Sequence, residues 1–121
     1  MKYLLLLTTL LLTGCQKANI YLYGKHISEQ EAAKLTAEFE QAGYRVEVNQ
    51  HAFPKEVSST SLLYSPLLRN RESINEVQDL LIKQGLEVNS ISSLIKGNHL
   101  VTKDAIAVFV VSDPRGIVAP V

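Results

Sequence analysis

The sequence predicts an α+β fold, a two-layer sandwich in which helices cover one face of a four- or five-stranded sheet. A strand–helix–strand pattern occurs twice, and the glycines that end its two helices, Gly43 and Gly85, lie 42 positions apart. A continuous apolar run at Ile106–Val111 is typical of a central strand. A tandem array would need three or more such units, so two similar βαβ units and a final strand predict one closed domain.

The first unit begins with a strand at Asn19–Gly24, in which aliphatic residues alternate with tyrosines. A helix follows, because Ser28 and Glu31 have the spacing of a capping box and Gly43 is suited to the helix C-terminus. Arg45–Asn49 alternates again and predicts the second strand. The buried stripe of the helix is expected to contain Ala32, Leu35, Phe39 and Ala42.

The second unit repeats this plan, with strands at Thr60–Ser65 and Glu87–Ile91. Asn70 is the expected helix N-cap and Gly85 the residue that closes the helix. Right-handed crossovers should place both helices on the same side of the sheet. The second apolar stripe is expected to contain Ile74, Val77, Leu80 and Leu81.

Two segments have no regular pattern. The connection 92–103 contains the turn signal Gly97-Asn98 and fits either a hairpin or a loop. Asp113-Pro114 ends regular structure, and residues 114–121 are expected to form a loose tail.

The N-terminus has the layout of a secretory signal: the basic start Met1-Lys2, a Leu-rich run to Leu12, and small residues before Cys15. The sequence Leu12-Thr13-Gly14-Cys15 resembles a bacterial lipobox. This resemblance implies that the chain is cut before Cys15, that the Cys15 sulfur carries a diacylglycerol and that the new amine is acylated. The expected parts are a signal peptide at 1–14, a lipidated tether at 15–18, one domain at 19–113 and the tail at 114–121.

Other interpretations of the N-terminus are a transmembrane helix, a buried core helix or a free thiol. The run is shorter than the roughly 20 apolar residues of a membrane span. Cys15 is the only cysteine, so an internal disulfide is excluded. Gln16 stands where inner-membrane lipoproteins of Gram-negative bacteria commonly have Asp, which favours the outer membrane, facing the periplasm, in such a host.

The charge balance argues against nucleic acid as a partner. The chain has 12 basic and 12 acidic residues, and loss of Lys2 with the signal peptide leaves 11 and 12. Nucleic-acid binding needs a concentrated basic surface. The expected partners are a membrane, through the lipid on Cys15, and peptidoglycan or an envelope protein, and no cofactor is expected.

The mature chain resembles the C-terminal domain of LytR-type cell-envelope proteins. The resemblance rests on Ala42–Val46 at a helix end, on the strand Thr60–Tyr64 and on an apolar strand that ends at Asp113. That family usually has an Asn-Gly turn after its first strand, where this chain has Tyr23–His26. The resemblance implies an envelope context without catalytic machinery. The duplicated layout is also similar to SPOR domains, which bind peptidoglycan glycan strands on an open sheet face.

A ligand site is expected on the sheet face opposite the helices. The face should present Tyr21, Tyr23, Arg45, Glu47 and Asn49. Aromatic rings beside amides and charges suit a sugar or peptide ligand. The alternative is an ordinary solvated face with cross-strand tyrosine packing.

No catalytic or metal-binding motif stands out. His26, His51 and His99 are isolated, there is no Gly-x-Ser-x-Gly elbow, and no Gly-rich phosphate loop occurs. Arg69 and Arg71 fit either simple solvation or contact with an anionic polymer or lipid headgroups.

Three functions follow as hypotheses. The leading one is a non-enzymatic, lipid-anchored binding domain for a cell-wall polymer or an envelope-assembly partner. The second is a small envelope hydrolase acting on cell-wall polysaccharide, which requires a concave site with coupled titratable groups. The third is an accessory, pilotin-like lipoprotein of a secretion or pilus machine, which predicts an exposed apolar patch or groove.

Overall fold

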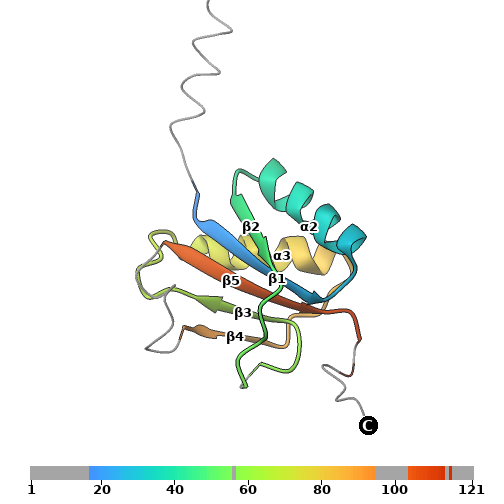
Figure 1. Cartoon of the computed structure of the whole chain (residues 1–121). Coiled ribbons are helices and arrows are strands. Elements are labelled where there is room, and N and C mark those ends of the chain that lie inside the picture. The colour runs from blue at the N-terminus through green and yellow to red at the C-terminus, as the bar shows by residue number, and fades with distance from the viewer. Residues whose placement is uncertain (1–16, 56, 95–103, 114, 116–121) are drawn as a thin grey trace, which may run out of the picture.

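The computed structural model describes residues 17–55, 57–94, 104–113 and 115. Within these residues, two helices pack on one five-stranded sheet, so the predicted α+β sandwich is confirmed (Figure 1). The elements follow in the order β1 (Asn19–His26), α2 (Glu29–Gln41), β2 (Arg45–Asn49), β3 (Ser61–Tyr64), α3 (Glu72–Lys83), β4 (Ser90–Ser93) and β5 (Ala105–Val111).

The strand order β2-β1-β5-β3-β4 places the last strand in the centre of the sheet. Within each unit the two strands are parallel neighbours, β1 with β2 and β3 with β4. Strand β5 is parallel to β1 but antiparallel to β3, so the two βαβ units run in opposite directions on either side of it. We call the end of the sheet where β1, β2 and β5 begin the entry end, and the opposite end the far end.

The two helices end in the same way. Gly43 has φ +100° and Gly85 has φ +85°, a left-handed conformation that favours glycine. The next residue donates its N–H back to the helix, Tyr44 to the Phe39 carbonyl and Leu86 to the Leu81 carbonyl, at 3.1 and 3.0 Å. These are the bonds of a Schellman cap, so the two glycines end the helices as predicted.

The helix N-termini are also capped near the predicted residues. The Ser28 hydroxyl accepts the Glu31 N–H at 3.1 Å, while the Glu31 carboxylate accepts a hydrogen bond from the Ser112 hydroxyl at 3.0 Å. In α3 the Asn70 side chain accepts the Glu72 N–H at 3.0 Å. Helix α2 therefore begins at its predicted N-cap, whereas the N-cap of α3 is Arg71, one residue after the predicted Asn70, and its side chain makes no cap hydrogen bond.

The main core lies between the helices and the sheet. Both predicted stripes contribute to it, and all seven residues of β5 are buried, in agreement with the central position predicted for the apolar run. The largest fully buried side chains of this layer are Phe39, Ile20, Leu22, Leu62, Leu81, Ile106, Val77, Val108 and Val110.

Several predicted boundaries differ from the structure. Strand β1 continues to His26 beyond Gly24, because it passes through a bulge rather than stopping at the glycine. Strand β4 begins at Ser90 instead of Glu87, because residues 86–89 complete the helix cap and lead back to β3, where the Asn89 N–H donates to the Thr60 carbonyl. The hairpin considered within 92–103 falls largely on residues 95–103, outside the described residues.

The signal peptide, Cys15 and most of the predicted tail also lie outside the described residues. Two of the four predicted tether residues pack on the domain. Ala18 is buried in the main core, and the Lys17 ammonium lies 2.7 Å from the Glu76 carboxylate of α3. No described helix is long and apolar enough to cross a membrane.

Candidate functional site

The tyrosines predicted to form an open ligand face lie on the expected side of the sheet, but Tyr23 is buried there. Its side chain is only 6% exposed, because its ring stacks on Phe109 of β5 with 4.2 Å between centroids and meets the edge of Phe53 at 6.2 Å. Tyr21 is partly buried against the same cluster. The prediction that Tyr23 is presented to a ligand is therefore wrong.

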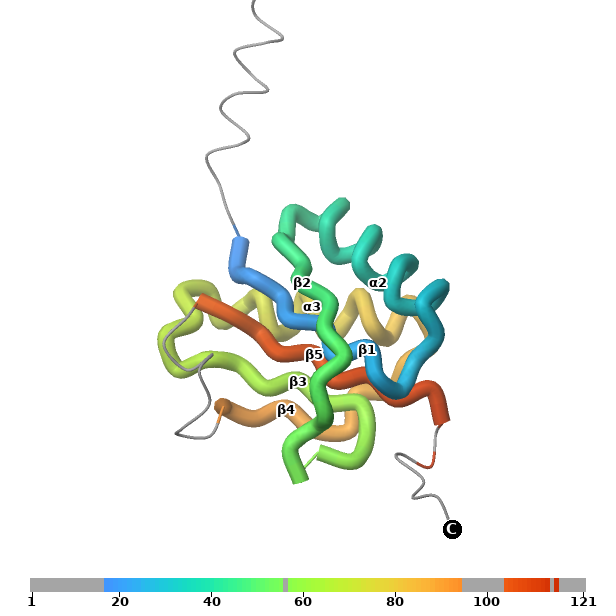
Figure 2. The backbone as a smooth tube through the Cα atoms, viewed as in Figure 1, coloured from blue at the N-terminus to red at the C-terminus, as the bar shows by residue number. Residues whose placement is uncertain are grey.

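The cause is the connection between β2 and β3, which we call the strap (residues 50–55 and 57–60). Figure 2 shows the strap crossing the sheet on the side away from the helices. It carries Phe53 onto Tyr23 and Phe109, and Val57 joins the same cluster. The strap therefore covers the part of the sheet face around Tyr23 and forms a second, smaller hydrophobic core there.

The other predicted site residues are separated from one another. Arg45 pairs with Asn19 at the entry end, whereas Asn49 pairs with Tyr23, four positions further along β1. Asn49 hydrogen-bonds to the Tyr23 hydroxyl, and its Oδ1 accepts the His51 N–H at 3.1 Å. Burial raises the pKa of the Tyr23 hydroxyl, and the bond to Asn49 offsets part of that rise. Asn49 and Tyr23 therefore hold the start of the strap in place, and Arg45 lies too far along β2 to form one site with them.

A hollow of about 360 Å³ lies beside the strap at the far end of the sheet. Its aromatic wall is Phe53, whose ring meets the His26 ring edge-on at 4.8 Å. Two exposed lysines also line the hollow, Lys25 of β1 and Lys55 of the strap. We call this site the basic hollow; its lining is Lys25, His26, Ala52, Phe53, Pro54, Lys55, Val57 and Ser58.

The bulge in β1 explains why two consecutive residues, Lys25 and His26, line this hollow. Tyr23 pairs with Phe109, yet His26, three positions on, pairs with Val111, only two positions on. One extra residue in β1 therefore brings His26 onto the face of Tyr23 and Phe109. The Val57 N–H donates to the Pro54 carbonyl at 3.0 Å, so a turn holds the opposite wall.

The ionisable side chains described in the lining of the basic hollow are all basic. Lys25, His26 and Lys55 supply basic groups, and no described lining residue is a carboxylate; Glu56 lies outside the described residues. A flat aromatic ring beside ammonium groups suits a ligand that combines apolar sugar or peptide surface with negative charge.

Two further depressions differ in character. A shallow groove of about 380 Å³ runs between α2 and the edge strand β2. Ala33, Ala37 and Val48 line it, and Val48 is 41% exposed. A smaller polar pocket of about 170 Å³ at the far end includes Glu87 and Asp113. Arg115 binds the Asp113 carboxylate through both Nε and Nη2, and this contact lowers the pKa of Asp113 to about 2.

Neither the basic hollow nor the apolar groove is predicted by a pattern in the sequence. In the sequence His26 is an isolated histidine, and no motif marks Phe53, Lys25 or Lys55 as site residues. The available signal was Phe53-Pro54, an aromatic residue and a proline inside an otherwise polar connection. Among the described residues, no group of three His, Cys, Asp or Glu side chains could hold a metal ion.

Comparison of the chain with protein-family models, with curated proteins and with solved structures finds no match in any of the three.

Proposed function

We propose that this protein is a lipid-anchored bacterial envelope protein whose domain is non-catalytic and binds an acidic cell-wall polymer in the basic hollow. The single observation that carries the proposal is the position of this hollow. It lies at the far end of β1, while the described chain begins at Lys17, next to the start of β1. The eight residues of β1 span about 25 Å, so a lipid on Cys15 would leave the hollow facing the wall compartment.

The chemistry of the hollow fits a carboxylate-bearing glycan such as peptidoglycan. Ammonium groups of Lys25 and Lys55 can each bind a carboxylate, while the exposed part of the Phe53 ring offers apolar area to a sugar face. The resemblance to LytR-type C-terminal domains and to SPOR domains implies the same cell-wall context, although the ligand here would lie beside the strap rather than on an open sheet.

Asp113 and Glu87 line the same pocket, but both oxygens of the Asp113 carboxylate bind Arg115. This contact holds the pKa of Asp113 at about 2, far from the value that suits a general acid at neutral pH. The envelope-hydrolase alternative stays a prediction without an observation in its favour.

The ligand is tested by co-sedimentation of the purified protein with peptidoglycan sacculi. Lys25→Gln/Lys55→Gln should weaken binding roughly tenfold, because two exposed charge contacts of up to about 1 kcal/mol each are lost. The matched control is Lys34→Gln/Lys83→Gln, which removes the same charge from exposed helix positions and should leave binding unchanged. Equal affinity of the two variants, or no binding by the unmodified protein, would contradict the proposal.

The anchor is tested separately by growing cells with a labelled palmitate. The expressed protein should incorporate the label and lack residues 1–14, whereas Cys15→Ser should do neither. Two or more acyl chains give stable membrane attachment, so the unmodified protein should fractionate with the envelope. Absence of label from a protein that retains its first fourteen residues would overturn the anchor.

The apolar groove between α2 and β2 favours a second candidate, an accessory role in an envelope assembly. Ala33, Ala37 and Val48 form an exposed apolar strip beside an edge strand whose outer backbone groups can pair with a peptide. A photo-crosslinking residue at position 33 should then capture one defined envelope protein in living cells, while the same residue at position 83 should not.

A further inference from the structure

We propose that the entry end of the domain lies directly on the bilayer and that its arginines bind anionic lipid headgroups. This inference rests on the proposed lipid at Cys15 and goes beyond it, since a lipid anchor alone leaves the orientation of the domain free. The surface concerned, which we call the arginine surface, consists of Arg45, Leu67, Arg69 and Arg71.

The short tether brings this surface close to the membrane. Only Gln16 separates Cys15 from Lys17 in the sequence. The distance from Cys15 to Lys17 is therefore at most about 7 Å, the length of two extended residues. Lys17 is fastened to the domain, because its Nζ lies 2.7 Å from Glu76 Oε1 and 5.1 Å from the centre of the Tyr44 ring. The domain surface around Lys17 must therefore lie within reach of the lipid headgroups.

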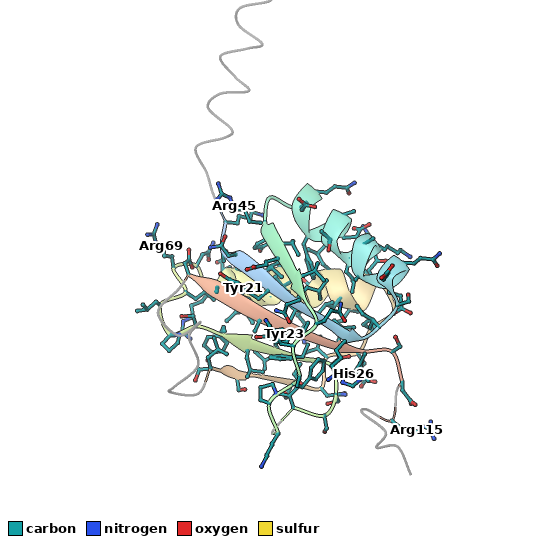
Figure 3. All side chains as sticks on the ribbon, in the orientation of Figure 1. Tyr21, Tyr23, His26, Arg45, Arg69 and Arg115 are labelled. Carbon is teal, nitrogen blue, oxygen red and sulfur yellow. The ribbon has the colours of Figure 1, made fainter. Side chains whose placement is uncertain are left out.

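The arginines surround the point where the chain enters the domain. Arg45 begins β2 and pairs with Asn19 at the start of β1. The turn after β3 brings Arg69 to the same end, since its N–H donates to Asp104 Oδ1 at 3.0 Å and the Asn19 N–H donates to the Asp104 carbonyl. Figure 3 shows Arg45 and Arg69 at the end where β1 begins, and His26 and Arg115 at the other end.

The guanidinium groups at this end are available to a ligand. All three arginines are exposed, and none takes part in the two ion pairs found among the described residues. Arg71 lies over the Tyr64 ring at 5.0 Å, which positions it without neutralising its charge. Guanidinium groups can bind the phosphate of a phospholipid headgroup through two parallel hydrogen bonds.

Among the described residues, no carboxylate at this end forms an ion pair with the arginines. Glu76 is paired with Lys17, and Asp104 accepts the Arg69 backbone N–H. Glu72 lies in the first turn of α3, where the helix dipole favours a negative charge. Glu40 lies on α2, where it lines the apolar groove beside β2.

Leu67 supplies the apolar part of a membrane contact. Its side chain is 57% exposed, whereas the neighbouring Leu68 is buried in the core. The Leu67 N–H donates to the Ser65 hydroxyl at 3.1 Å, which helps to fix the turn that presents it. An apolar side chain among basic ones is typical of surfaces that lie in the headgroup region of an anionic bilayer.

The test uses the intact lipoprotein reconstituted into vesicles that contain phosphatidylglycerol and nitroxide-labelled headgroups. Because the Cys15 sulfur is occupied by the lipid, a fluorophore can be attached to Leu67→Cys or, at the far end, to Ser58→Cys. Quenching should be several-fold stronger at position 67 than at position 58. The difference should shrink on vesicles of phosphatidylcholine alone and at about 0.5 M salt, where screening is short-ranged.

Charge variants separate the arginine surface from general electrostatics. Arg45→Gln/Arg69→Gln should weaken adsorption of this end by roughly tenfold or more, at about fivefold per basic residue, and reduce quenching at position 67. The control Lys34→Gln/Lys83→Gln carries the same net charge and should keep the difference between the two labels. Circular dichroism of each variant establishes that the fold is retained.

The outcomes distinguish this inference from the proposed function. Equal quenching at positions 67 and 58 in a protein that stays on the vesicles would overturn the inference and leave the anchor intact. A protein that fails to remain on vesicles of either composition would overturn the anchor and, with it, the inference.

Discussion

At each end of the sheet one helix begins and the other ends, but the two ends differ in the side chains on their surfaces. Because the βαβ units run in opposite directions, α2 ends and α3 begins at the entry end, whereas α2 begins and α3 ends at the far end. The entry end carries Arg45 at the start of β2, and Leu67, Arg69 and Arg71 on the turn between β3 and α3. The far end carries two lysines and a histidine around an aromatic wall.

This difference comes from the connections and not from the repeated units. At the entry end the turn 65–71 is short and is fixed by Ser65 and by Asp104, so its arginines project from the surface. At the far end the strap crosses the sheet, packs Phe53 edge-on against Phe109 and leaves a hollow beside it. These two connections therefore give the two ends of a fold built from repeated units different surface chemistry.

The largest effect should come from removing the aromatic wall of the hollow. Phe53→Ala should lower the free energy of unfolding by about 2–3 kcal/mol, because the half-buried ring loses its contacts with Tyr23, His26 and Phe109. The melting temperature should fall by roughly 10–20 °C. At the entry end, Leu67→Ala should change stability by no more than about 0.5 kcal/mol, because Leu67 is exposed.

Calorimetry of the two variants checks this contrast. If Phe53→Ala melts at the same temperature as Leu67→Ala, the strap contributes nothing to the folded state, and the distinction between a packed far end and an open entry end is lost.

The same contrast shows what the sequence could predict. Periodic features were sufficient for the helix face: the apolar stripes, the helix-ending glycines and the apolar run of β5 act within one element or between neighbouring ones. Boundaries failed where tertiary contacts decide them, as at β4, where residues after Gly85 complete a cap before pairing begins.

The candidate site could not be predicted because it depends on one non-local packing event. Alternation placed Tyr21 and Tyr23 on the correct face, but no local pattern shows that Phe53, thirty positions later, folds back onto Tyr23. The β1 bulge that brings His26 beside it is equally invisible, since it appears only in the pairing of β1 with β5. Arg45 lies on the predicted face but at the entry end of β2, four positions from Asn49, which pairs with Tyr23.

A medium effect should come from the two helix-ending glycines, which lie at opposite ends. Gly43→Ala and Gly85→Ala should each cost about 1–2 kcal/mol, because both positions have a left-handed φ that disfavours a side chain. A Cβ at Gly43 would lie 3.4 Å from Lys17 Cδ, whereas a Cβ at Gly85 meets nothing within 4 Å. Only the entry-end variant should therefore make a new contact with Lys17.

A double-mutant cycle with Glu76→Gln, measured by urea unfolding, separates these cases. Gly43→Ala should couple to Glu76→Gln through Lys17, and Gly85→Ala should be additive with it within about 0.5 kcal/mol. Identical coupling at both glycines would mean that the end of the tether is not fastened where the structure places it.

The smallest effect should be an acid-sensitive contribution confined to the entry end. The hydrogen bond from Lys17 lowers the pKa of the Glu76 carboxyl below its usual 4.5. A lowered folded-state pKa contributes stability that is complete above pH 4.5 and is lost as the pH falls through the folded-state value. Since the pair is substantially exposed, Glu76→Gln should cost only about 0.5 kcal/mol at pH 7 and close to nothing at pH 2.5.

Urea unfolding of both proteins at the two pH values measures this difference directly. Glu47→Gln is the matched control, because it removes an exposed carboxylate that has no ion pair among the described residues. Its effect should be the same at pH 7 and pH 2.5. A Glu76→Gln difference that does not change with pH would show that Lys17 is held by something other than the ionised carboxylate, and the tether would then stay fastened to the domain in acid.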